Sequence, residues 1–274
     1  MVKIENLTFW YNKKSILFDK LNMNLMSGKI YGLFGLNGAG KTTLLKHIAG
    51  LLFPKSGECK VFDMHSSDRK PGILADIFII PEEFSLPNIT AESYVAINAP
   101  FFPKFDYKEF ESYINEFQIS FGKKINTMSY GQRKKLLIAF SLACNTSLLL
   151  MDEPTNGLDI PSKSQFRKII AASGNESRCL LISTHQVRDL GSIIDQVTIL
   201  DNGKIIFDKN IDAISQKLAF GMLKEGSKEE VIFAEDNLMG SAAVYHNKGT
   251  DSNIDLELLF NAVINDAEKV NNAF

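Results

Sequence analysis

Eight residues near the N-terminus have the types and the spacing of a phosphate-binding loop. The stretch Gly35 to Thr42 reads Gly-Leu-Asn-Gly-Ala-Gly-Lys-Thr and matches the pattern G-x-x-x-x-G-K-[ST]. Its glycines let the backbone curl so that several N–H groups point at phosphate oxygens. We expect Lys41 to reach the β- and γ-phosphates of a nucleotide and the Thr42 hydroxyl to ligate Mg²⁺. The alternative is a glycine turn that only packs a helix on a strand.

A pair of adjacent carboxylates closes an apolar stretch later in the chain. Asp152 and Glu153 directly follow the run Leu148 to Met151. At the carboxyl end of a buried strand, Asp152 is suited to hold Mg²⁺ through water and Glu153 to polarise an attacking water. Alone, a strand that simply ends at solvated charges would be the better interpretation. Together with a phosphate loop in a doubly wound pattern, the pair favours nucleotide hydrolysis.

A third motif, Ser129-Tyr130-Gly131-Gln132, precedes the carboxylate pair. Ser129 and Gln132 have the spacing of a capping box, which predicts that a helix begins here. A helix N-terminus with a small polar cap and an adjacent glycine can bind an anion. The alternative is an ordinary capped helix.

The segments around these motifs predict a parallel sheet with helical connections. Short apolar runs have the character of strands that are covered on both faces. These runs are Ile30–Phe34, Ala75–Ile80, Leu148–Met151 and Cys179–Ile182. Helices are expected over residues 42–49, where Gly50 would end the helix, and over residues 161–172.

Other segments predict additions to this sheet. Apolar residues alternate with polar ones along two N-terminal stretches, at Ile4, Leu7, Phe9, Leu21, Met23 and Leu25. This alternation predicts strands with one buried face, joined by a polar turn at residues 12–14. A helical pattern from about residue 85 to residue 145 predicts an inserted helical subdomain. Residues 197–207 predict a hairpin around an Asn-Gly turn.

The last part of the chain, residues 211–274, is expected to be a small α+β extension. Residues 231–233 and 243–245 have the pattern of two short strands, and residues 254–264 that of an amphipathic helix followed by a polar end. The extension could be an appended domain or packing for the main one.

Composition excludes several classes of protein. The 274 residues carry a formal net charge of -2, which gives no general attraction to nucleic acid, and none is expected as a partner. Three widely spaced cysteines fit neither a disulfide framework nor a zinc cluster. The alternating N-terminus does not predict a secretory signal, and no apolar run has the length expected of a spanning helix.

Taken together, the motifs resemble those of the ATP-binding cassette (ABC) family. The segments that match its Walker A, signature, Walker B, D-loop and switch histidine are, in order, Gly35–Thr43, Ser129–Gln132, Leu148–Glu153, Gly157–Asp159 and His185. The resemblance covers residues 1–210, which are therefore expected to form the ATP-binding domain. It implies an α/β P-loop NTPase of the ABC type, with a mixed sheet core, an N-terminal antiparallel β-subdomain and an inserted α-helical subdomain.

The resemblance implies that two such domains pack head to tail, with each ATP between the Walker A of one and the signature of the other. The residues implied to bind ATP within one subunit are Tyr11, Asn37, Gly38, Ala39, Gly40, Lys41, Thr42 and Thr43. Tyr11 resembles the aromatic that stacks on adenine, and a hairpin packing residue is the alternative.

Other residues have roles that the resemblance implies at the far side of the nucleotide. The signature residues Ser129, Tyr130, Gly131 and Gln132 would contact the partner's ATP. Asp159 would couple the two sites across the interface. His185 would bond the γ-phosphate and help to hold the water that Glu153 activates.

Two positions depart from the family pattern. Tyr130 replaces the first glycine of the usual L-S-G-G-Q signature, and Pro81-Glu82-Glu83 stands where the family often has a glutamine. A Glu82 oxygen can still ligate Mg²⁺ or order a water. Both departures, together with residues 101–106 and 254–260, are similar to a branch of small bacterial exporters that includes bacitracin-resistance and acetoin-associated ATPases.

The resemblance therefore implies an ATP-hydrolysing transporter subunit, from an exporter, with ATP and Mg²⁺ as cofactors. Its implied partners are a separate transmembrane permease subunit and a second ATP-binding subunit, identical or not. It would be cytoplasmic and sit on the inner face of the cell membrane through the permease. The permease would dock at a groove beside residues 82–110. The aromatic candidates there, which could instead fill the helical subdomain's own core, are Phe101, Phe102, Phe105 and Phe110.

Two other functions stay open on the sequence. One is a non-transport cassette ATPase that acts on a cytosolic or nucleic-acid partner; a single cassette without sustained heptads disfavours it. The other is a catalytically idle regulatory module, which the intact Lys41, Asp152, Glu153 and His185 disfavour.

Overall fold

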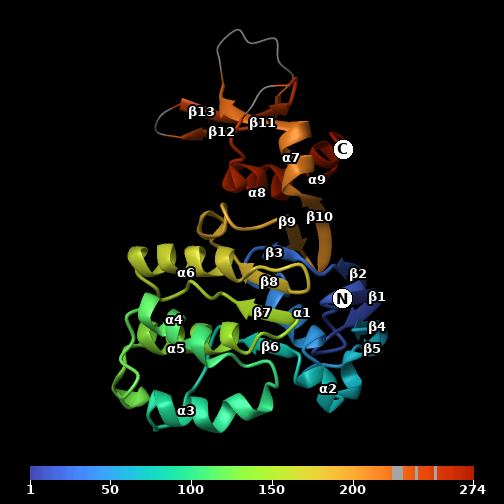
Figure 1. Cartoon of the computed structure of the whole chain (residues 1–274). Helices are drawn as coiled ribbons and strands as arrows, with labels where there is room; N and C mark the ends of the chain where they lie inside the picture. Colours follow the sequence, from blue (N-terminus) through green and yellow to red (C-terminus); the bar gives the residue numbers. More distant parts are fainter. Residues whose placement is uncertain (224–230, 238–239, 250–251) are drawn as a thin grey trace.

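Apolar runs form a six-stranded central sheet in the computed structural model, which describes residues 1–223, 231–237, 240–249 and 252–274 (Figure 1). Its strands are β3 (Lys29–Phe34), β6 (Ile77–Ile80), β7 (Leu148–Asp152), β8 (Cys179–Thr184), β9 (Gln196–Asp201) and β10 (Lys204–Asn210). The order across the sheet is β10-β9-β3-β8-β7-β6, and only β10 is antiparallel to its neighbour. Every residue of β7 and β8 is buried, as expected for parallel strands between two layers.

One detail of the prediction changes in this sheet, and another is confirmed. The strand β6 begins at Ile77 and not at Ala75, because residues 71–74 form a short helix, α2 (Pro71–Leu74), and the N–H of Ala75 bonds to Pro71. The hairpin of β9 and β10 is confirmed, since Asn202 and Gly203 both have positive φ angles, 44° and 72°, as its tight turn requires.

The N-terminal sheet is antiparallel, as predicted, in the order β2-β1-β4-β5. Its strands are β1 (Val2–Phe9), β2 (Phe18–Leu25), β4 (Ser56–Val61) and β5 (Met64–His65). The helix α1 (Lys41–Ile48) lies between this sheet and the central one. Its Leu44, Leu45 and Ile48 are buried in a core that also contains Leu7 and Leu181.

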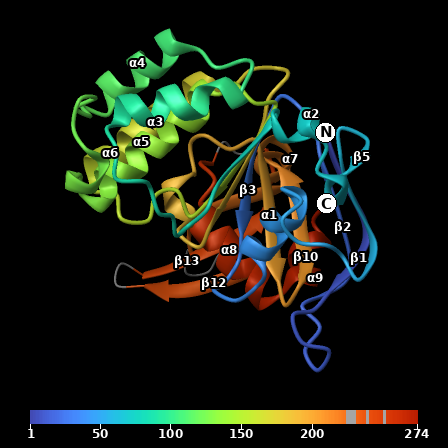
Figure 2. The same cartoon turned by 90° about the horizontal axis from the view of Figure 1, so that it is seen from below.

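Helices cover the other side of the central sheet. They are α3 (Ala91–Asn98), α4 (Tyr107–Glu116), α5 (Tyr130–Ala143) and α6 (Ile160–Ser173), and Figure 2 shows them together on one side of the strands. The predicted helical subdomain is thus helical from Ala91, and the short 3-10 turns η2 (Ala99–Phe101) and η3 (Ile125–Thr127) lie between its helices. Another 3-10 turn, η1 (Ser66–Asp68), lies outside the subdomain. Side-chain caps begin its first two helices, since Thr90 accepts from Ser93 and Asp106 accepts from Lys108.

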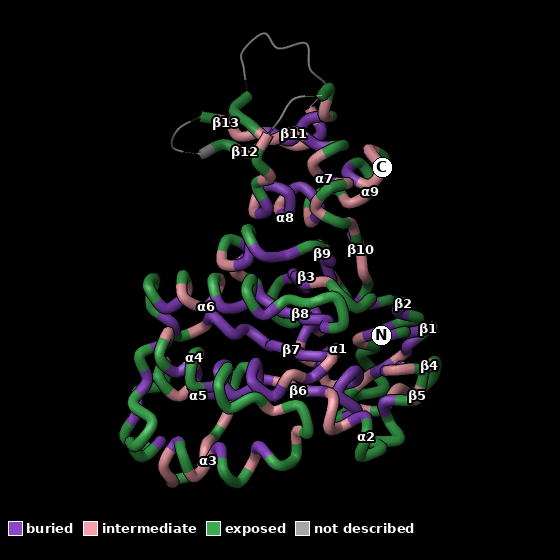
Figure 3. Tube along the Cα trace, viewed as in Figure 1, coloured by how far each residue is buried: buried purple, intermediate pink, exposed green. Residues whose placement is uncertain are grey.

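The C-terminal segment adds a three-stranded antiparallel sheet in the order β11-β13-β12. Its elements are α7 (Ile211–Lys217), β11 (Leu218–Met222), β12 (Val231–Asn237), β13 (Gly240–His246), α8 (Leu256–Asn265) and α9 (Ala267–Asn271). The two expected strands and the amphipathic helix are present, while α7, β11 and α9 were not predicted. Buried positions continue from the central strands into α8 (Figure 3), and one apolar cluster contains both Val187 and Leu259. The domain boundary at residue 210 stays a prediction.

Among the described residues, no helix combines the length and the apolar character that crossing a membrane requires.

Two phenylalanines of the helical layer allow a test of this packing. Phe117 is 0% exposed and Phe101 is 70% exposed. We expect Phe117→Ala to lower the free energy of unfolding by about 3–5 kcal/mol, because it leaves a cavity in the core. Phe101→Ala should change it by no more than about 0.5 kcal/mol. Urea denaturation followed by circular dichroism measures both, and similar losses in the two variants would contradict the packing described here.

Candidate active site

A cavity of about 600 Å³ opens at the carboxyl ends of β3, β7 and β8. Its lining residues are Tyr11, Asn12, Ser15, Leu17, Asn37, Gly38, Gly40, Lys41, Thr42, Thr43, Glu82, Asp152, Glu153 and His185. All of these except Asn12, Ser15 and Leu17 were predicted as site residues. Residues from five separate parts of the chain therefore meet at one place.

The phosphate loop connects β3 to α1 with a strongly curved backbone. Gly38 and Gly40 have φ angles of 84° and 108°, in the left-handed region that disfavours any residue with a side chain. Gly40 is the N-cap of α1, so the helix begins at Lys41 with its N–H groups and positive dipole end directed at the cavity. The buried Ala39 belongs to the same loop but does not line the cavity.

Lys41 is the cation of the site, and its side chain is only 7% exposed. Its Nζ donates to the carbonyl oxygens of Gly35 at 2.8 Å and Leu36 at 3.2 Å, and lies 3.8 Å from Glu153 Oε1. Burial lowers the pKa of Lys41, while the charges of Glu153 and Asp152 act in the opposite direction. The ammonium therefore lies between the loop and the carboxylate pair.

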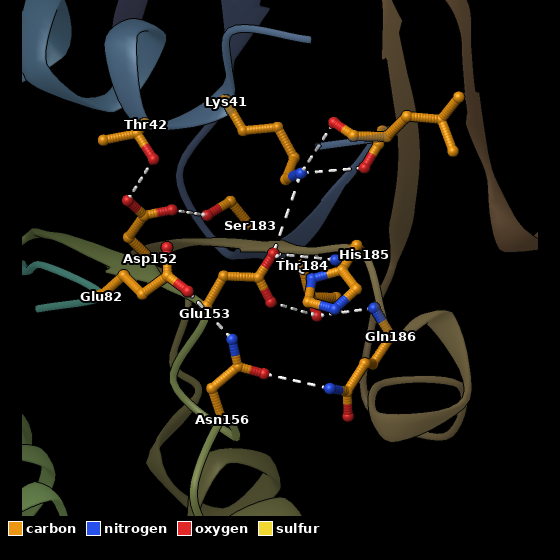
Figure 4. Close-up of polar contacts among 12 residues, drawn as sticks. Lys41, Thr42, Glu82, Asp152, Glu153, Asn156, Ser183, Thr184, His185 and Gln186 are labelled. Atoms are coloured by element: carbon orange, nitrogen blue, oxygen red, sulfur yellow. Dashed lines mark hydrogen bonds and ion pairs between the residues drawn. The ribbon is translucent and has the colours of Figure 1, made fainter. Parts of the chain in front are cut away.

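Asp152 brings two oxygen donors together on the cavity wall (Figure 4). The Thr42 hydroxyl donates to Asp152 Oδ2 at 2.6 Å, and the Ser183 hydroxyl donates to Oδ1. Glu82 lines the same cavity. Mg²⁺ prefers hard oxygen ligands and is commonly held by one or two carboxylates, with water and phosphate completing its shell. In the described ranges, no group of three or more His, Cys, Asp or Glu is arranged to hold a metal ion. The smaller set of oxygen atoms on Thr42, Asp152 and Glu82 nevertheless fits Mg²⁺, because phosphate and water can complete the shell of this ion.

Glu153 is almost fully buried, and several neighbouring groups contact its carboxylate. Its Oε2 accepts from the Thr184 hydroxyl at 2.9 Å, and its Oε1 accepts from the His185 backbone N–H at 2.9 Å. His185 Nδ1 also lies 2.8 Å from Oε1. The backbone of Glu153 has a φ of 46°, which is uncommon for a residue with a side chain and is often found at functional sites.

Sequence reasoning missed several polar residues that hold this pair. Ser183 and Thr184 are hydroxyl residues that end an otherwise apolar strand, and that change of polarity was the available signal. Asn156 donates to Glu82 Oε1 and accepts from Gln186, both at 3.1 Å (Figure 4). These bonds link the loop after β6 to the turn after β7 and the segment after β8.

Tyr11 lies at the rim of the cavity and is 66% exposed. Its hydroxyl is 3.0 Å from Thr43 Oγ1, and its ring packs edge-on against Phe9 at a centroid distance of 4.9 Å. One aromatic face is thus available beside the phosphate loop.

The signature residues do not line the cavity of their own chain. Ser129 begins α5 with the predicted capping box: its hydroxyl accepts from the Gln132 N–H at 3.2 Å, and Gln132 Oε1 accepts from the Ser129 N–H at 3.0 Å. Tyr130 stacks on Phe84 and donates its hydroxyl to the Glu82 carbonyl at 3.0 Å. Ser129, Tyr130 and Gln132 are exposed, and the neighbouring Gly131 is partly exposed.

Asp159 also lies outside the cavity. Its carboxylate accepts from the Ser162 N–H at 2.9 Å and so caps α6. Hydrogen bonding to the Ser162 side chain, together with this bond to the Ser162 backbone, lowers the pKa of Asp159.

A family model and the curated relatives of this chain point to the same family of proteins. A family model described as ABC transporter matches residues 18–156. The chain is 33% identical over 215 residues to the lantibiotic transport ATP-binding protein SrtF of Streptococcus pyogenes, covering 77% of this chain and 92% of the relative. It is 32% identical over 222 residues to the bacitracin transport ATP-binding protein BcrA of Bacillus licheniformis, covering 79% and 72%.

Two solved structures have the same fold. An ATP-binding subunit of an ABC transporter has a TM-score of 0.71 at 24% identity, and the match covers 78% of this chain and 91% of that one. A dimeric ATP-binding cassette in a post-hydrolysis state, bound to ADP and Pi, has a TM-score of 0.68 at 22% identity, with coverage of 77% and 99%.

The hydroxyl of Thr184 provides a test of how the buried carboxylate is held. We expect Thr184→Val to lower the free energy of unfolding by about 1–3 kcal/mol, because Glu153 Oε2 then lacks its hydroxyl donor. Thr184→Ser keeps the hydroxyl and is the matched control, with a smaller loss. Chemical denaturation measures both variants. Equal stability of Thr184→Val and the parent chain would show that this bond contributes nothing.

Proposed function

Because the chain belongs to the ABC transporter family, as one of its ATP-binding proteins, we propose that it is the ATP-hydrolysing subunit of an exporter. The observation that carries the proposal is the single cavity that combines the phosphate loop, the Asp152–Glu153 pair and His185. The bacitracin and lantibiotic relatives are named transport ATP-binding proteins, which supports a role in transport. In this family, cassettes dimerise and pair with transmembrane subunits.

ATP binds along the cavity in this proposal. The adenine stacks on the exposed face of Tyr11, and the phosphates lie on the loop from Asn37 to Thr43. Lys41 leaves the carbonyl oxygens of its own loop and pairs with the β- and γ-phosphates. The exchange is favourable because a charged phosphate oxygen is a stronger acceptor than a neutral carbonyl.

Thr42 and Asp152 would hold Mg²⁺, and Glu82, which lines the same cavity, would bind it or order one of its waters. A bound Mg²⁺ neutralises charge on the phosphates. Glu153 orients the attacking water and accepts its proton, while His185 donates to the γ-phosphate. Thr184 and the His185 backbone N–H keep the Glu153 carboxylate aimed into the cavity.

The other half of the site comes from a second ATP-binding subunit. Ser129, Tyr130, Gly131 and Gln132 line no part of their own chain's cavity, and the N-terminus of α5 that they form is suited to an anion. They therefore contact the γ-phosphate bound by the partner, and Asp159 couples the two sites across the interface. ATP then joins the two subunits, and its hydrolysis releases them to move a separate permease at the cytoplasmic face of the membrane.

Removing the charge of Glu153 tests this proposal. Glu153→Gln should still bind ATP but lower kcat by about 10²–10⁴-fold, because the general base is lost. The variant should accumulate as an ATP-bound dimer, which size-exclusion chromatography with light scattering detects. Glu176→Gln, an exposed position outside the cavity, is the control and should hydrolyse ATP at the parent rate. Undiminished hydrolysis by Glu153→Gln would refute the proposed function.

The permease docks on the helical side near Phe101. Of the four candidate aromatics, Phe110 is buried, and Phe102 and Phe105 are half-buried against Phe140, so these three fill the helical subdomain's own core. Phe101 is 70% exposed and lies near the exposed Tyr107 in sequence. Phe101 is therefore the aromatic that supports a docking surface for a short helix of the permease.

Site-directed crosslinking tests this surface. The three native cysteines are buried, so a cysteine placed at Phe101 offers an exposed reactive thiol. In the complex with a co-expressed permease, Phe101→Cys labelled with a maleimide–benzophenone reagent should photo-crosslink to the permease. Met26→Cys, at a residue that is 61% exposed and directly follows β2 of the antiparallel sheet, should not. Crosslinking of Met26→Cys but not of Phe101→Cys, read by gel and mass spectrometry, would contradict a docking surface at Phe101.

A further inference from the structure

A fully buried lysine lies behind the catalytic carboxylate. Lys134 is 0% exposed and belongs to α5, just after the signature residues that begin this helix. Its Nζ donates to the backbone carbonyl of Glu153 at 2.7 Å and to that of Asn156 at 3.2 Å. Burial lowers the pKa of Lys134 to about 8, which reflects the cost of placing an ammonium where neutral carbonyls are its hydrogen-bond partners.

The two carbonyls that Lys134 binds are the two ends of one tight turn. The Asn156 N–H bonds back to the Glu153 carbonyl at 3.2 Å, which closes the turn. One end carries the Glu153 carboxylate and has the left-handed backbone. The other end carries the Asn156 amide, which binds Glu82 and Gln186 (Figure 4). Lys134 therefore fixes the backbone of the segment on which most of the polar network depends.

The neighbouring lysine shows that this contact is specific to one position of the helix. Lys135 points elsewhere: its Nζ lies 3.4 Å from Ser162 Oγ and 6.0 Å from the Phe117 ring. Lys134 lies five positions after Ser129, which corresponds to about 7.5 Å along a helix axis. A displacement of the N-terminus of α5 is therefore transmitted directly to the Lys134 ammonium.

We propose that Lys134 is a positioning residue that couples the signature helix to the catalytic turn of the same subunit. The inference rests on the proposed function, in which the N-terminus of α5 contacts the partner's ATP while Glu153 serves the subunit's own ATP. When Ser129 engages the partner's nucleotide, α5 is fixed, and Lys134 then holds the Glu153 backbone in its reactive place. Hydrolysis in one site thus depends on the occupancy of the other.

Steady-state kinetics of two variants tests the coupling. Lys134→Met keeps the length of the side chain but donates no hydrogen bond, and Lys134→Gln keeps an amide donor. We expect Lys134→Met to lower kcat by about 10- to 100-fold, to leave the affinity for ATP within about 3-fold, and to lower the Hill coefficient for ATP to one. Lys134→Gln should recover part of both kcat and cooperativity. Lys168→Met, at a lysine that is 71% exposed, is the control and should behave as the parent chain.

Three results would overturn the inference. The first is a Hill coefficient of one in the parent chain or an unchanged coefficient in Lys134→Met. The second is a kcat for Lys134→Met within about 3-fold of the control. The third is a parallel loss of kcat, ATP affinity and urea midpoint in both Lys134 variants, which would indicate a purely structural role. Failure of the proposed function is recognised separately, since the parent chain and Glu153→Gln would then hydrolyse ATP equally.

Discussion

The arrangement of the site depends on holding two adjacent carboxylates inside the protein. Asp152 and Glu153 are 2% and 3% exposed, and a buried charge is tolerated only where it is paired or hydrogen-bonded. Their partners come from other elements: Ser183 and Thr184 from the end of β8, and Thr42 from the start of α1. The register that places Asp152 opposite Ser183 is therefore critical, because a slip of one residue would turn these side chains to the opposite face of the sheet.

The same constraint explains which parts could be predicted from the sequence. The turn at Asn202-Gly203 and the capping box at Ser129 have local causes, so a few neighbouring residues suffice to predict them. A local change of polarity marks Thr184, but its carboxylate partner follows only from β-strand register, and the carbonyl partners of Lys134 follow only from helix packing. Lys134 also stands between Arg133 and Lys135, so it has the sequence character of a solvated surface although it is fully buried.

The two departures from the family pattern contact each other. The Tyr130 hydroxyl donates to the Glu82 carbonyl, so the residue that replaces the signature glycine binds the segment that replaces the usual glutamine. Space for the ring comes from Gly157, since a Cβ there would lie 2.8 Å from Tyr130 ring atoms. A larger residue at position 157 would therefore displace Tyr130 and weaken its contact with Glu82. The two departures are better understood as one altered contact than as two separate losses.

The C-terminal extension constrains the site from the opposite direction. The helix α8 packs against η4 (Val187–Asp189), the short turn that directly follows the site residues His185 and Gln186, and Glu257 of α8 pairs with Arg188. That ion pair is largely solvated and contributes little by itself, so the apolar core shared by η4 and α8 provides most of the attachment. The segment carrying His185 is thus bonded to Glu153 on one side and packed against the extension on the other. A displacement of His185 either breaks its polar contacts in the cavity or separates η4 from α8. The packing of the extension on η4 therefore helps to set the position of this histidine.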